Sequence, residues 1–223
     1  MVYLKRARAL LGVAIIIAGS FIIIRPWLNA WYFDFMQARI IQTWLDEDLY
    51  GWSGGPREPA WTTATITIGD TRPNNNIWDE NINPTMDLMH LASITDGILT
   101  IDRINLRVPI LNEYTGRNLD ISINSVNPRV RMGDTGNYVL TGHASRIFGR
   151  HFNRLRELSP GDKIVVENKS ERFEYIVYDS FSVTASDVWV MDRDGDRSII
   201  TLITCDHRTN PVGRLIVRGE LVS

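Results

Sequence analysis

The single cysteine of the chain, Cys205, stands where a protein can present a reactive side chain. It ends the apolar run Ser198–Cys205, which indicates a buried β-strand, and the polar stretch Asp206–Asn210 follows directly. Binding and catalytic residues often lie where a rigid strand ends and a loop begins. A lone cysteine with apolar neighbours is about as often a small, inert core residue. Taken alone, Cys205 leaves both nucleophilic chemistry and simple packing open.

A nucleophilic cysteine needs a partner that exchanges protons, and histidine is suited to this because its reference pKa is about 6.5. Of the four histidines, His143 is the best placed, because it closes a predicted strand and the preceding Gly142 permits a close backbone approach. The other three histidines are expected elsewhere: in a linker (His90), at the surface at the start of a short helix (His151), and in a solvated loop (His207).

A cation follows the cysteine in the sequence. Arg214 lies nine residues after Cys205 and begins the next predicted strand, so a hairpin of the two strands would place both residues near one end. An arginine beside a cysteine can stabilise a thiolate or an oxyanion, or hold a peptide by hydrogen bonds. Arg218 lies four residues further along the same strand face and is the competing candidate. The spacing alone does not choose between the two arginines, and a solvated surface position would explain either.

The elements that must position these residues are short strands. From Gly97 onwards, apolar segments alternate with turn residues and predict eight strands, over residues 98–104, 106–111, 119–124, 137–142, 163–167, 172–178, 198–205 and 214–222. Phe152, Leu155 and Leu158 recur every three residues and predict a short helix. Eight short strands over about 125 residues favour a closed barrel or a sandwich.

The N-terminus indicates a membrane anchor. Residues 9–24 carry no charge, whereas basic residues stand on both sides, at Lys5, Arg6, Arg8 and Arg25. As a helix this segment is about 24 Å long, and residues 26–28 extend it towards the roughly 30 Å hydrocarbon thickness of a bilayer. The basic start predicts a cytoplasmic N-terminus and an external remainder. A cleaved signal peptide is the alternative. Its one possible cleavage site with a small residue lies around residues 28–30, and bulky aromatic residues follow directly, which counts against cleavage.

The chain therefore divides into five predicted parts. They are a cytoplasmic basic segment (1–8), a transmembrane anchor (9–28), a juxtamembrane helix (29–50), a linker or lid (51–95) and a β-rich domain (96–223). Apolar residues at three- and four-residue steps support the juxtamembrane helix, and the run of glycines and prolines that follows breaks it.

Composition excludes some classes of function. The 223 residues carry 24 basic and 26 acidic side chains, a net charge of −2, whereas a nucleic-acid-binding protein usually carries a positive excess. One cysteine excludes an intramolecular disulfide framework and a cysteine-based zinc site.

Together these residues resemble the sortase family of membrane-anchored cysteine transpeptidases. Thr201–Cys205 is similar to the TLxTC motif of that family, and Leu140–His143 is similar to its catalytic-histidine motif. Arg214–Gly219 resembles the strand that carries the catalytic arginine, and aligning this strand selects Arg214 over Arg218. The resemblance extends over the whole predicted β-rich domain, with the motifs in the same order.

The resemblance implies an all-β fold, a closed eight-stranded barrel with short helices, and acyl transfer. Cys205 would attack the threonine carbonyl of an LPxTG-like sorting signal and form a thioester. His143 would protonate the leaving amine and deprotonate the incoming one, and Arg214 would hold the substrate backbone and stabilise the oxyanion. The implied partners are surface proteins that bear the signal, the amine of a peptidoglycan precursor and the cell membrane, but no nucleic acid.

The resemblance implies no metal or organic cofactor in the chemistry, although some family members bind calcium as a modulator. Carboxylates occur in the loop before the cysteine strand (Asp187, Asp192, Asp194 and Asp196), but they do not by themselves define a calcium site. The loop 179–197 is expected to shape the signal pocket. Residues 148–155 resemble class D sortases more than class A, so the expectation is an anchoring sortase of class D or a related class, with a pilin-polymerising sortase as the alternative.

Three other classes compete with this interpretation. L,D-transpeptidases place a His-Gly pair shortly before their cysteine, whereas Ile203 and Thr204 precede Cys205 here. A papain-like hydrolase would have its cysteine near the N-terminus of a helix. The non-enzymatic alternative is an anchored β-barrel binding module in which Cys205 is buried and reacts slowly with a thiol probe.

Overall fold

The computed structural model describes residues 19–21, 24, 28, 31, 32, 34–46, 84–127, 129–145, 150–209 and 212–223. The chain forms two units, Met1–Met36 and Gln37–Ser223, each described by itself. In the first unit the described residues are helical, and the rings of Trp31 and Phe35 stack with their centroids 5.8 Å apart. The predicted anchor, 9–28, lies for the most part outside the described residues. Where the chain is described, no helix is both long and apolar enough to cross a membrane.

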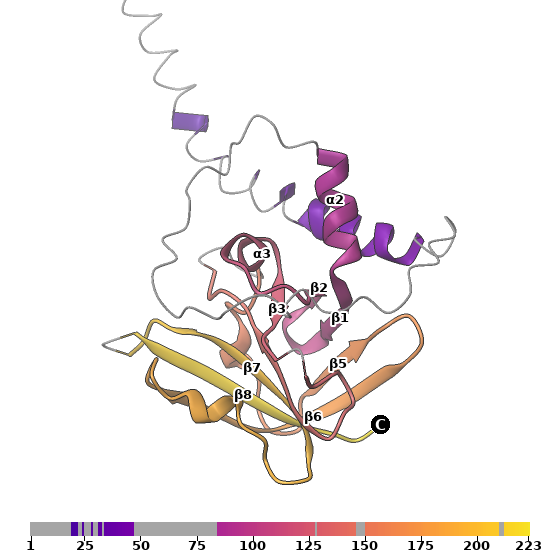
Figure 1. Ribbon diagram of the computed structural model, residues 1–223. Helices are drawn as coiled ribbons and strands as arrows, with labels where there is room; N and C mark the ends of the chain where they lie inside the picture. The colour runs from indigo at the N-terminus through magenta and orange to yellow at the C-terminus, as the bar shows by residue number, and fades with distance from the viewer. Residues whose placement is uncertain are drawn as a thin grey trace, which may run out of the picture. The chain divides into compact units, whose positions relative to one another are not determined.

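Eight strands close into a barrel, as the sequence predicts (Figure 1). They are β1 (Thr95–Ile101), β2 (Leu106–Leu111), β3 (Ile123–Ser125), β4 (Gly136–Thr141), β5 (Lys163–Glu167), β6 (Arg172–Val183), β7 (Ser198–Asp206) and β8 (Gly213–Leu221). Around the barrel they follow the order β1-β2-β3-β4-β7-β8-β6-β5. The pairs β2/β3 and β4/β7 are parallel, and the other pairs are antiparallel.

Short helices connect the strands: α2 (Pro84–Ser93), η3 (Asp102–Ile104), α3 (Gly116–Ile121), η4 (Leu155–Glu157) and η5 (Val188–Met191). The predicted strand over residues 119–124 is wrong in its first half, which belongs to α3. Thr115 caps this helix, because its side-chain oxygen accepts a hydrogen bond of 3.1 Å from the backbone N–H of Asn118. The cap supplies a partner for an N–H at the start of the helix, and this local bonding outweighs the alternating apolar pattern.

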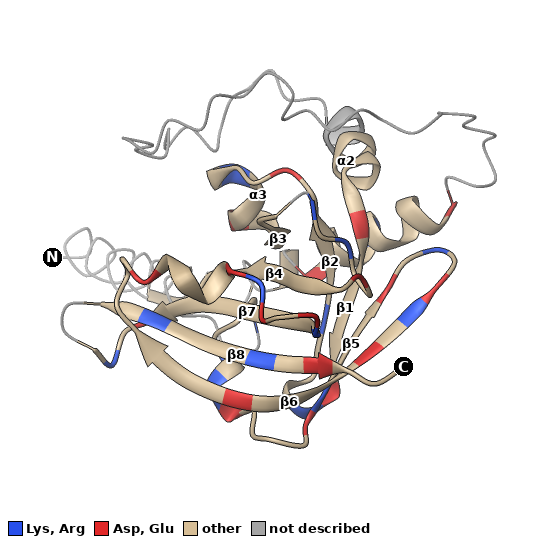
Figure 2. Cartoon of the chain, turned by 60° about the horizontal axis from the view of Figure 1, so that its bottom comes forward, with Lys and Arg blue, Asp and Glu red and all other residues tan. Residues whose placement is uncertain are grey.

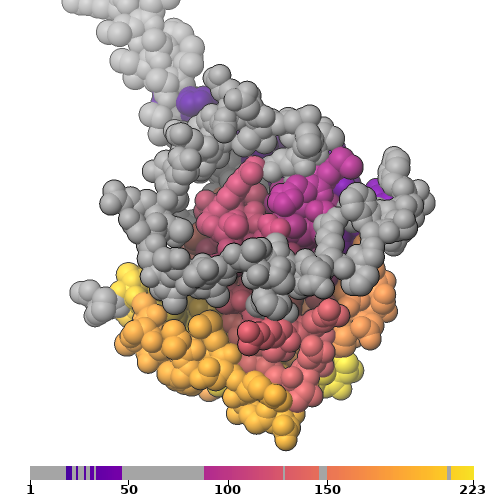
Figure 3. Space-filling view, viewed as in Figure 1, coloured from indigo at the N-terminus to yellow at the C-terminus, as the bar shows by residue number. Residues whose placement is uncertain are grey.

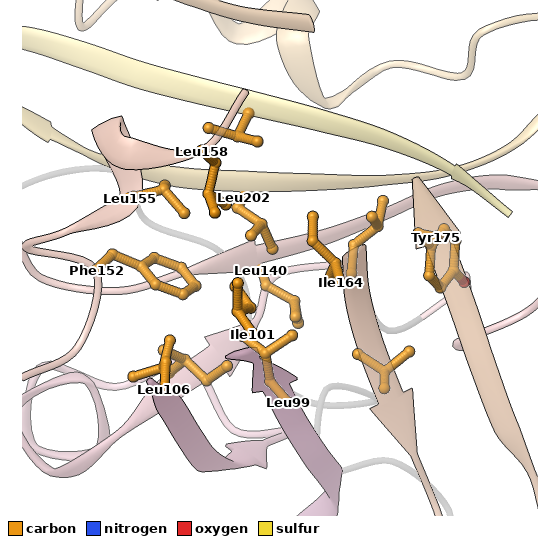
Figure 4. Close-up of a cluster of buried hydrophobic side chains, with 14 of the residues drawn as sticks. Leu99, Ile101, Leu106, Leu140, Phe152, Leu155, Leu158, Ile164, Tyr175 and Leu202 are labelled. Atoms are coloured by element: carbon orange, nitrogen blue, oxygen red, sulfur yellow. The ribbon is translucent and has the colours of Figure 1, made fainter. Parts of the chain in front are cut away.

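The barrel interior is filled by apolar side chains from most of the strands and from the segment around η4. Figure 4 shows ten of them pointing towards one another, each at most 4% exposed: Leu99, Ile101, Leu106, Leu140, Phe152, Leu155, Leu158, Ile164, Tyr175 and Leu202. Burying an apolar side chain of this size stabilises a fold by about 1.5–3 kcal/mol. This continuous core makes the barrel a rigid support for the strand ends.

Within the second unit, the helical residues 37–46 pack against α2 and the barrel through two small apolar clusters. In one cluster, Ile40 packs with side chains of α2 and with Leu111 of β2; in the other, Ile41 and Trp44 pack with Ala92 of α2 and Ile98 of β1. α2 lies within the stretch 51–95 that was expected to be a linker or lid, and β1 begins at Thr95. The remaining predicted part boundaries lie outside the described residues.

Candidate active site

Cys205 and Arg214 are direct cross-strand neighbours. β7 and β8 pair antiparallel, and their register sets Cys205 opposite Arg214, between the pairs Thr204–Leu215 and Asp206–Gly213. Residues directly opposite in an antiparallel pair carry Cβ atoms about 4.5–5.5 Å apart on one face of the sheet. Both side chains are partly exposed. The backbone pairing therefore places Cys205 and Arg214 side by side at one end of the barrel, where solvent reaches both. Nη1 of Arg214 donates a hydrogen bond of 3.1 Å to the Gly213 carbonyl.

His143 follows β4, which runs parallel to β7. The last residue of β4 pairs with Ile203, and the N–H of Gly142 donates a hydrogen bond of 3.1 Å to the Ile203 carbonyl. The hydroxyl of Thr204 donates to the Gly142 carbonyl at 2.8 Å. These two bonds continue the contact between the segments beyond the strand and bring His143 to the end of β7 that carries Cys205.

Only glycine fits at position 142. A Cβ there would lie 2.9 Å from Cγ2 of Ile123 and 2.9 Å from Cδ2 of Phe152, which is closer than real Cβ atoms come. The close backbone approach predicted for Gly142 is thus confirmed.

The imidazole of His143 has a carboxylate partner that the sequence did not reveal. Its Nε2 lies 3.1 Å from Oδ1 of Asp120, which stands on α3. An ionised carboxylate can only accept hydrogen bonds, so Nε2 is the donor of this pair. Both side chains remain about half exposed. The segment that contains Asp120 was predicted to be a strand, so the sequence could not indicate that this side chain points towards His143.

The prediction that His151 lies at the surface is wrong. Its residue is 3% exposed, it adopts a left-handed backbone conformation with φ of 50°, and its ring meets that of His143 edge-on with centroids 6.2 Å apart. The N–H of Phe152 bonds to the His143 carbonyl at 3.1 Å, which draws the segment inwards. Burial lowers the pKa of His151 to about 3, and the charges of Arg150 and His143 add to this effect. His151 is therefore a neutral core residue at physiological pH.

The two remaining histidines are exposed, and neither has a described contact with the residues gathered around Cys205. His207 lies in the turn after β7, as predicted. His90 stands on α2, with its Nε2 3.7 Å from a carboxylate oxygen of Glu113.

Arg218 is engaged away from the cysteine. Its Nη2 donates a 3.1 Å hydrogen bond to the carbonyl of Val190 in η5. Its guanidinium lies 5.7 Å from the ring centre of Phe181 and 5.5 Å from that of Trp189, and these two rings stack on each other. Figure 2 shows β8 with its two basic positions well separated along the strand. Arg214 is thus the arginine that the fold brings to Cys205, whereas Arg218 attaches η5 to the barrel.

Asp206, the residue after Cys205, has a buried carboxylate that joins three segments. One of its oxygens accepts from the hydroxyl of Ser182 at 2.6 Å and lies 2.6 Å from Nη2 of Arg156, while the other accepts from the N–H of Arg208 at 3.1 Å. The Ser182 hydrogen bond, with help from Arg156, lowers the pKa of Asp206 to about 2. The end of β7 is therefore fixed to β6 and to η4 by a side chain that is ionised at neutral pH.

A hollow of about 670 Å³ opens beside the cysteine and arginine pair. It is lined by residues 182–187 and by Trp189, Thr209, Val212 and Gly213. Val183 pairs with Arg214, and Gly213 pairs with Asp206, so the hollow borders the reactive end of the sheet. Ser182 and Val183 end β6, which continues five residues beyond the predicted strand 172–178. Residues 184–187 and Trp189 belong to the stretch 179–197, which the family resemblance implies would shape the signal pocket.

A second attachment fixes this loop from the β4 side. The side-chain amide of Asn137 donates to the carbonyls of Val190 and Asp192, each at 3.0 Å, and its oxygen accepts from the hydroxyl of Thr201 at 2.7 Å. In Figure 3 the side chains of the loop, in amber, lie beside those that lead into β4, in rose. Thr201 of the cysteine motif thus supports the loop, whereas Thr204 of the same motif supports the histidine.

Two of the four acidic residues of the loop, Asp187 and Asp194, are occupied by local contacts. Asp187 accepts hydrogen bonds from Thr184, and Asp194 pairs with Arg197 at 2.8 Å. Among the residues that the structure describes, no three potential metal ligands converge. The expectation that the chemistry uses no cofactor stays a prediction.

Comparisons with known proteins agree on one family. A family model described as "Sortase domain" matches residues 99–222. Sortase A of Bacillus anthracis is 34% identical over 126 residues, which cover 56% of this chain and 59% of that protein. Sortase A of Listeria monocytogenes is 29% identical over 125 residues, which cover 56% of this chain and 55% of that protein. The chain thus spans less than two thirds of the length of these relatives.

Solved structures show the same fold. The structure of Listeria monocytogenes sortase A matches with a TM-score of 0.55 at 27% identity, covering 58% of this chain and 88% of that one. The structure of sortase E from Streptomyces avermitilis matches with a TM-score of 0.52 at 25% identity, covering 58% of this chain and 88% of that one. The relatives include sortases A, D and E, so the expectation of class D stays a prediction.

Proposed function

The chain belongs to the sortase family, and we propose that it is a cysteine transpeptidase that cleaves an LPxTG-like sorting signal and joins the protein to a cell-wall precursor amine. The observation that carries this proposal is the direct pairing of Cys205 with Arg214, with His143 brought to the same end of the barrel. An inert binding module has no use for these three side chains together at a solvent-accessible strand end.

In the first half-reaction the thiolate of Cys205 attacks the threonine carbonyl of the sorting signal, since the thiolate is the nucleophilic form of cysteine. The carbonyl oxygen becomes an oxyanion, and the guanidinium of Arg214, which stands opposite Cys205 in the paired strands, stabilises this charge. His143 gives a proton to the leaving amine as the Thr–Gly bond breaks. A thioester on Cys205 and a free amine on the released peptide result.

In the second half-reaction an amine of the wall precursor attacks the thioester. His143, now neutral, accepts the proton that this amine loses as the new amide bond forms. The sulfur leaves as a thiolate and the histidine is again protonated, so the enzyme returns to its starting state. One peptide bond is broken and one is formed, which is why the reaction needs no external energy source.

The hollow beside the site suits the apolar part of a sorting signal. Its lining includes Val183, Ala185, Trp189 and Val212, whose apolar surfaces match the leucine and proline at the start of an LPxTG-like peptide. A peptide bound there would extend along the strand end towards Cys205. The attachments of Arg218 and of Asn137 to η5 keep Trp189 in place for this contact.

We place the enzyme at the cell membrane, with its N-terminus in the cytoplasm and its barrel outside. The support is the uncharged segment 9–24 and its basic flanks. Trp31 and Tyr32 follow it and are largely exposed, as aromatic residues at a membrane interface are. This location gives the enzyme access to secreted surface proteins and to peptidoglycan precursors.

The test uses the full chain, kept in detergent because of its apolar N-terminal segment. It is incubated with LPxTG-like peptides and several amines, and mass spectrometry identifies the products. We expect a product that joins the fragment ending in threonine to the amine, and we expect none from Cys205→Ala. Turnover by Cys205→Ala would contradict the assignment, and cleavage that never gives an amine adduct would indicate a hydrolase.

A further inference from the structure

The hydrogen bond between His143 and Asp120 lies outside the trio of Cys205, His143 and Arg214 used above. We propose that Asp120 is a positioning residue: its carboxylate holds the proton of His143 on Nε2 and leaves Nδ1 as the nitrogen that exchanges protons. The inference rests on the proposed function, because only a reaction that uses His143 for proton transfer needs its ring fixed in this way.

The geometry of the pair supports this role. Nε2 of His143 lies 3.1 Å from Oδ1 of Asp120, within hydrogen-bond distance. A neutral imidazole carries one proton, and the bond made by one ring nitrogen determines which nitrogen carries it. A carboxylate at Nε2 therefore selects one tautomer and one ring orientation. It also stays bonded when the ring is doubly protonated, so it serves both half-reactions.

α3 holds Asp120 in a fixed place although the aspartate itself is about half exposed. At the start of the helix, Thr115 accepts from the N–H of Asn118, and the amide of Asn118 donates to the Glu113 carbonyl at 3.1 Å. At its end, the hydroxyl of Ser122 donates to the Pro109 carbonyl at 2.6 Å. Asn118 and Ser122 are both buried. These bonds connect the helix to β2, a strand of the barrel.

Two further contacts connect α3 to its neighbours on either side. Arg150, in the segment that follows His143, donates to the backbone carbonyl of Asp120 at 2.7 Å. The buried amide of Gln37 donates to the carbonyl of Ile121 at 3.1 Å, from the helical segment 37–46. The helix that carries Asp120 is therefore bonded both to the segment after His143 and to the helical residues 37–46.

The effect is expected in kcat, because an exposed pair contributes little to stability and the substrate contacts lie elsewhere. Asp120→Ala should lower kcat about tenfold, a part of what general acid–base catalysis contributes, with KM and the melting temperature nearly unchanged. Asp120→Glu keeps a carboxylate and should recover part of the rate. Asp102→Ala, which removes an exposed aspartate from η3, is the matched control and should behave as the wild type.

A spectroscopic measurement separates positioning from a merely structural role. Nitrogen-15 NMR of the histidine rings in the full chain, at a pH where the His143 ring is neutral, reports which nitrogen bears the proton. We expect the Nε2–H form in the wild type and a mixture of both forms in Asp120→Ala. An Nδ1–H form in the wild type, or an unchanged tautomer together with unchanged kcat in Asp120→Ala, would overturn the proposal. If the wild type transfers no peptide to any amine, the proposed function fails, and the NMR result still decides the role of Asp120.

Discussion

The two sides of the active site are held by different kinds of bond. On the β7–β8 side, Cys205 and Arg214 are set opposite each other by a continuous antiparallel ladder of eight residue pairs. On the β4 side, His143 lies beyond the end of its strand. It depends on the Gly142–Ile203 bond, the hydroxyl of Thr204 and the carboxylate of Asp120.

This difference indicates which part of the site tolerates substitution of neighbouring side chains and which part does not. A backbone ladder does not depend on the identity of any one side chain, so the nucleophile and the arginine keep their relative position when neighbours are substituted. The histidine is positioned by two backbone bonds and by two side chains, so the loss of the Thr204 hydroxyl or the Asp120 carboxylate removes part of its support. Substitutions of the side chains that support His143 should therefore act mainly through proton transfer.

The largest effect is expected on the ladder side, from Arg214→Lys. A lysine supplies a point charge in place of the planar guanidinium fork, so we expect kcat/KM to fall about 10²- to 10³-fold while the fold is kept. The matched control is Arg218→Lys, four residues along the same strand, which should keep kcat near the wild-type value and change only KM, because Arg218 holds η5 beside the hollow. Near-normal rates in Arg214→Lys would move the catalytic role to Arg218.

The next effect tests the histidine side through Thr204→Val. Valine keeps the shape but removes the hydroxyl that bonds to the Gly142 carbonyl, so we expect a loss of about 1–3 kcal/mol in unfolding free energy and a roughly tenfold lower kcat.

Thr201→Val is the matched control, because it removes an equally buried hydroxyl of the same motif that bonds instead to Asn137. It should lose similar stability but change KM more than kcat, since Asn137 supports the loop that lines the hollow. The same kinetic change in both variants would show that the two sides are not separate.

No large effect on turnover is expected from His151, whose contribution is to the pH dependence of stability. Its pKa is lowered to about 3 in the folded protein, mainly by burial, whereas an unfolded histidine titrates near 6.5. Between these values the unfolded chain binds more protons, so His151 makes stability fall by up to about 1.4 kcal/mol per pH unit as the pH drops. His151→Asn, which tolerates the left-handed backbone, should flatten this slope in urea unfolding between pH 6.5 and 4. An unchanged slope would contradict a buried, neutral His151.

The smallest effect is expected from His207→Ala. His207 is exposed and stands two residues beyond the cysteine, outside the bonds that fix either side of the site. Its removal should leave kcat/KM within about twofold, a difference of less than 0.5 kcal/mol. Complete loss of activity would mean that the proton is exchanged by His207 and not by His143.

The sequence was sufficient for the parts of the site that lie in apolar strands. The strand ends near Cys205 and His143 were predictable because apolar runs and turn residues mark them, whereas the choice of Arg214 over Arg218 needed the family resemblance. α3 was missed because the cap at Thr115 outweighs an alternating pattern.

Asp120 and Asp206 were missed for a different reason. Asp120 meets His143 across 23 residues, and Asp206 meets Ser182 across 24. No local pattern in the sequence encodes such contacts, because only the closed barrel brings these segments together. The burial of His151 depends in the same way on the bond between Phe152 and His143.

The most direct test of the account is to trap the acyl-enzyme. The full chain is mixed with an excess of an LPxTG-like peptide and no added amine, quenched in acid, and its intact mass and peptide map are measured. We predict a mass increase equal to the peptide fragment that ends in threonine, located on Cys205 and removed by hydroxylamine, as a thioester is. An adduct on another residue, or release of the glycine fragment without any adduct on Cys205, would contradict it.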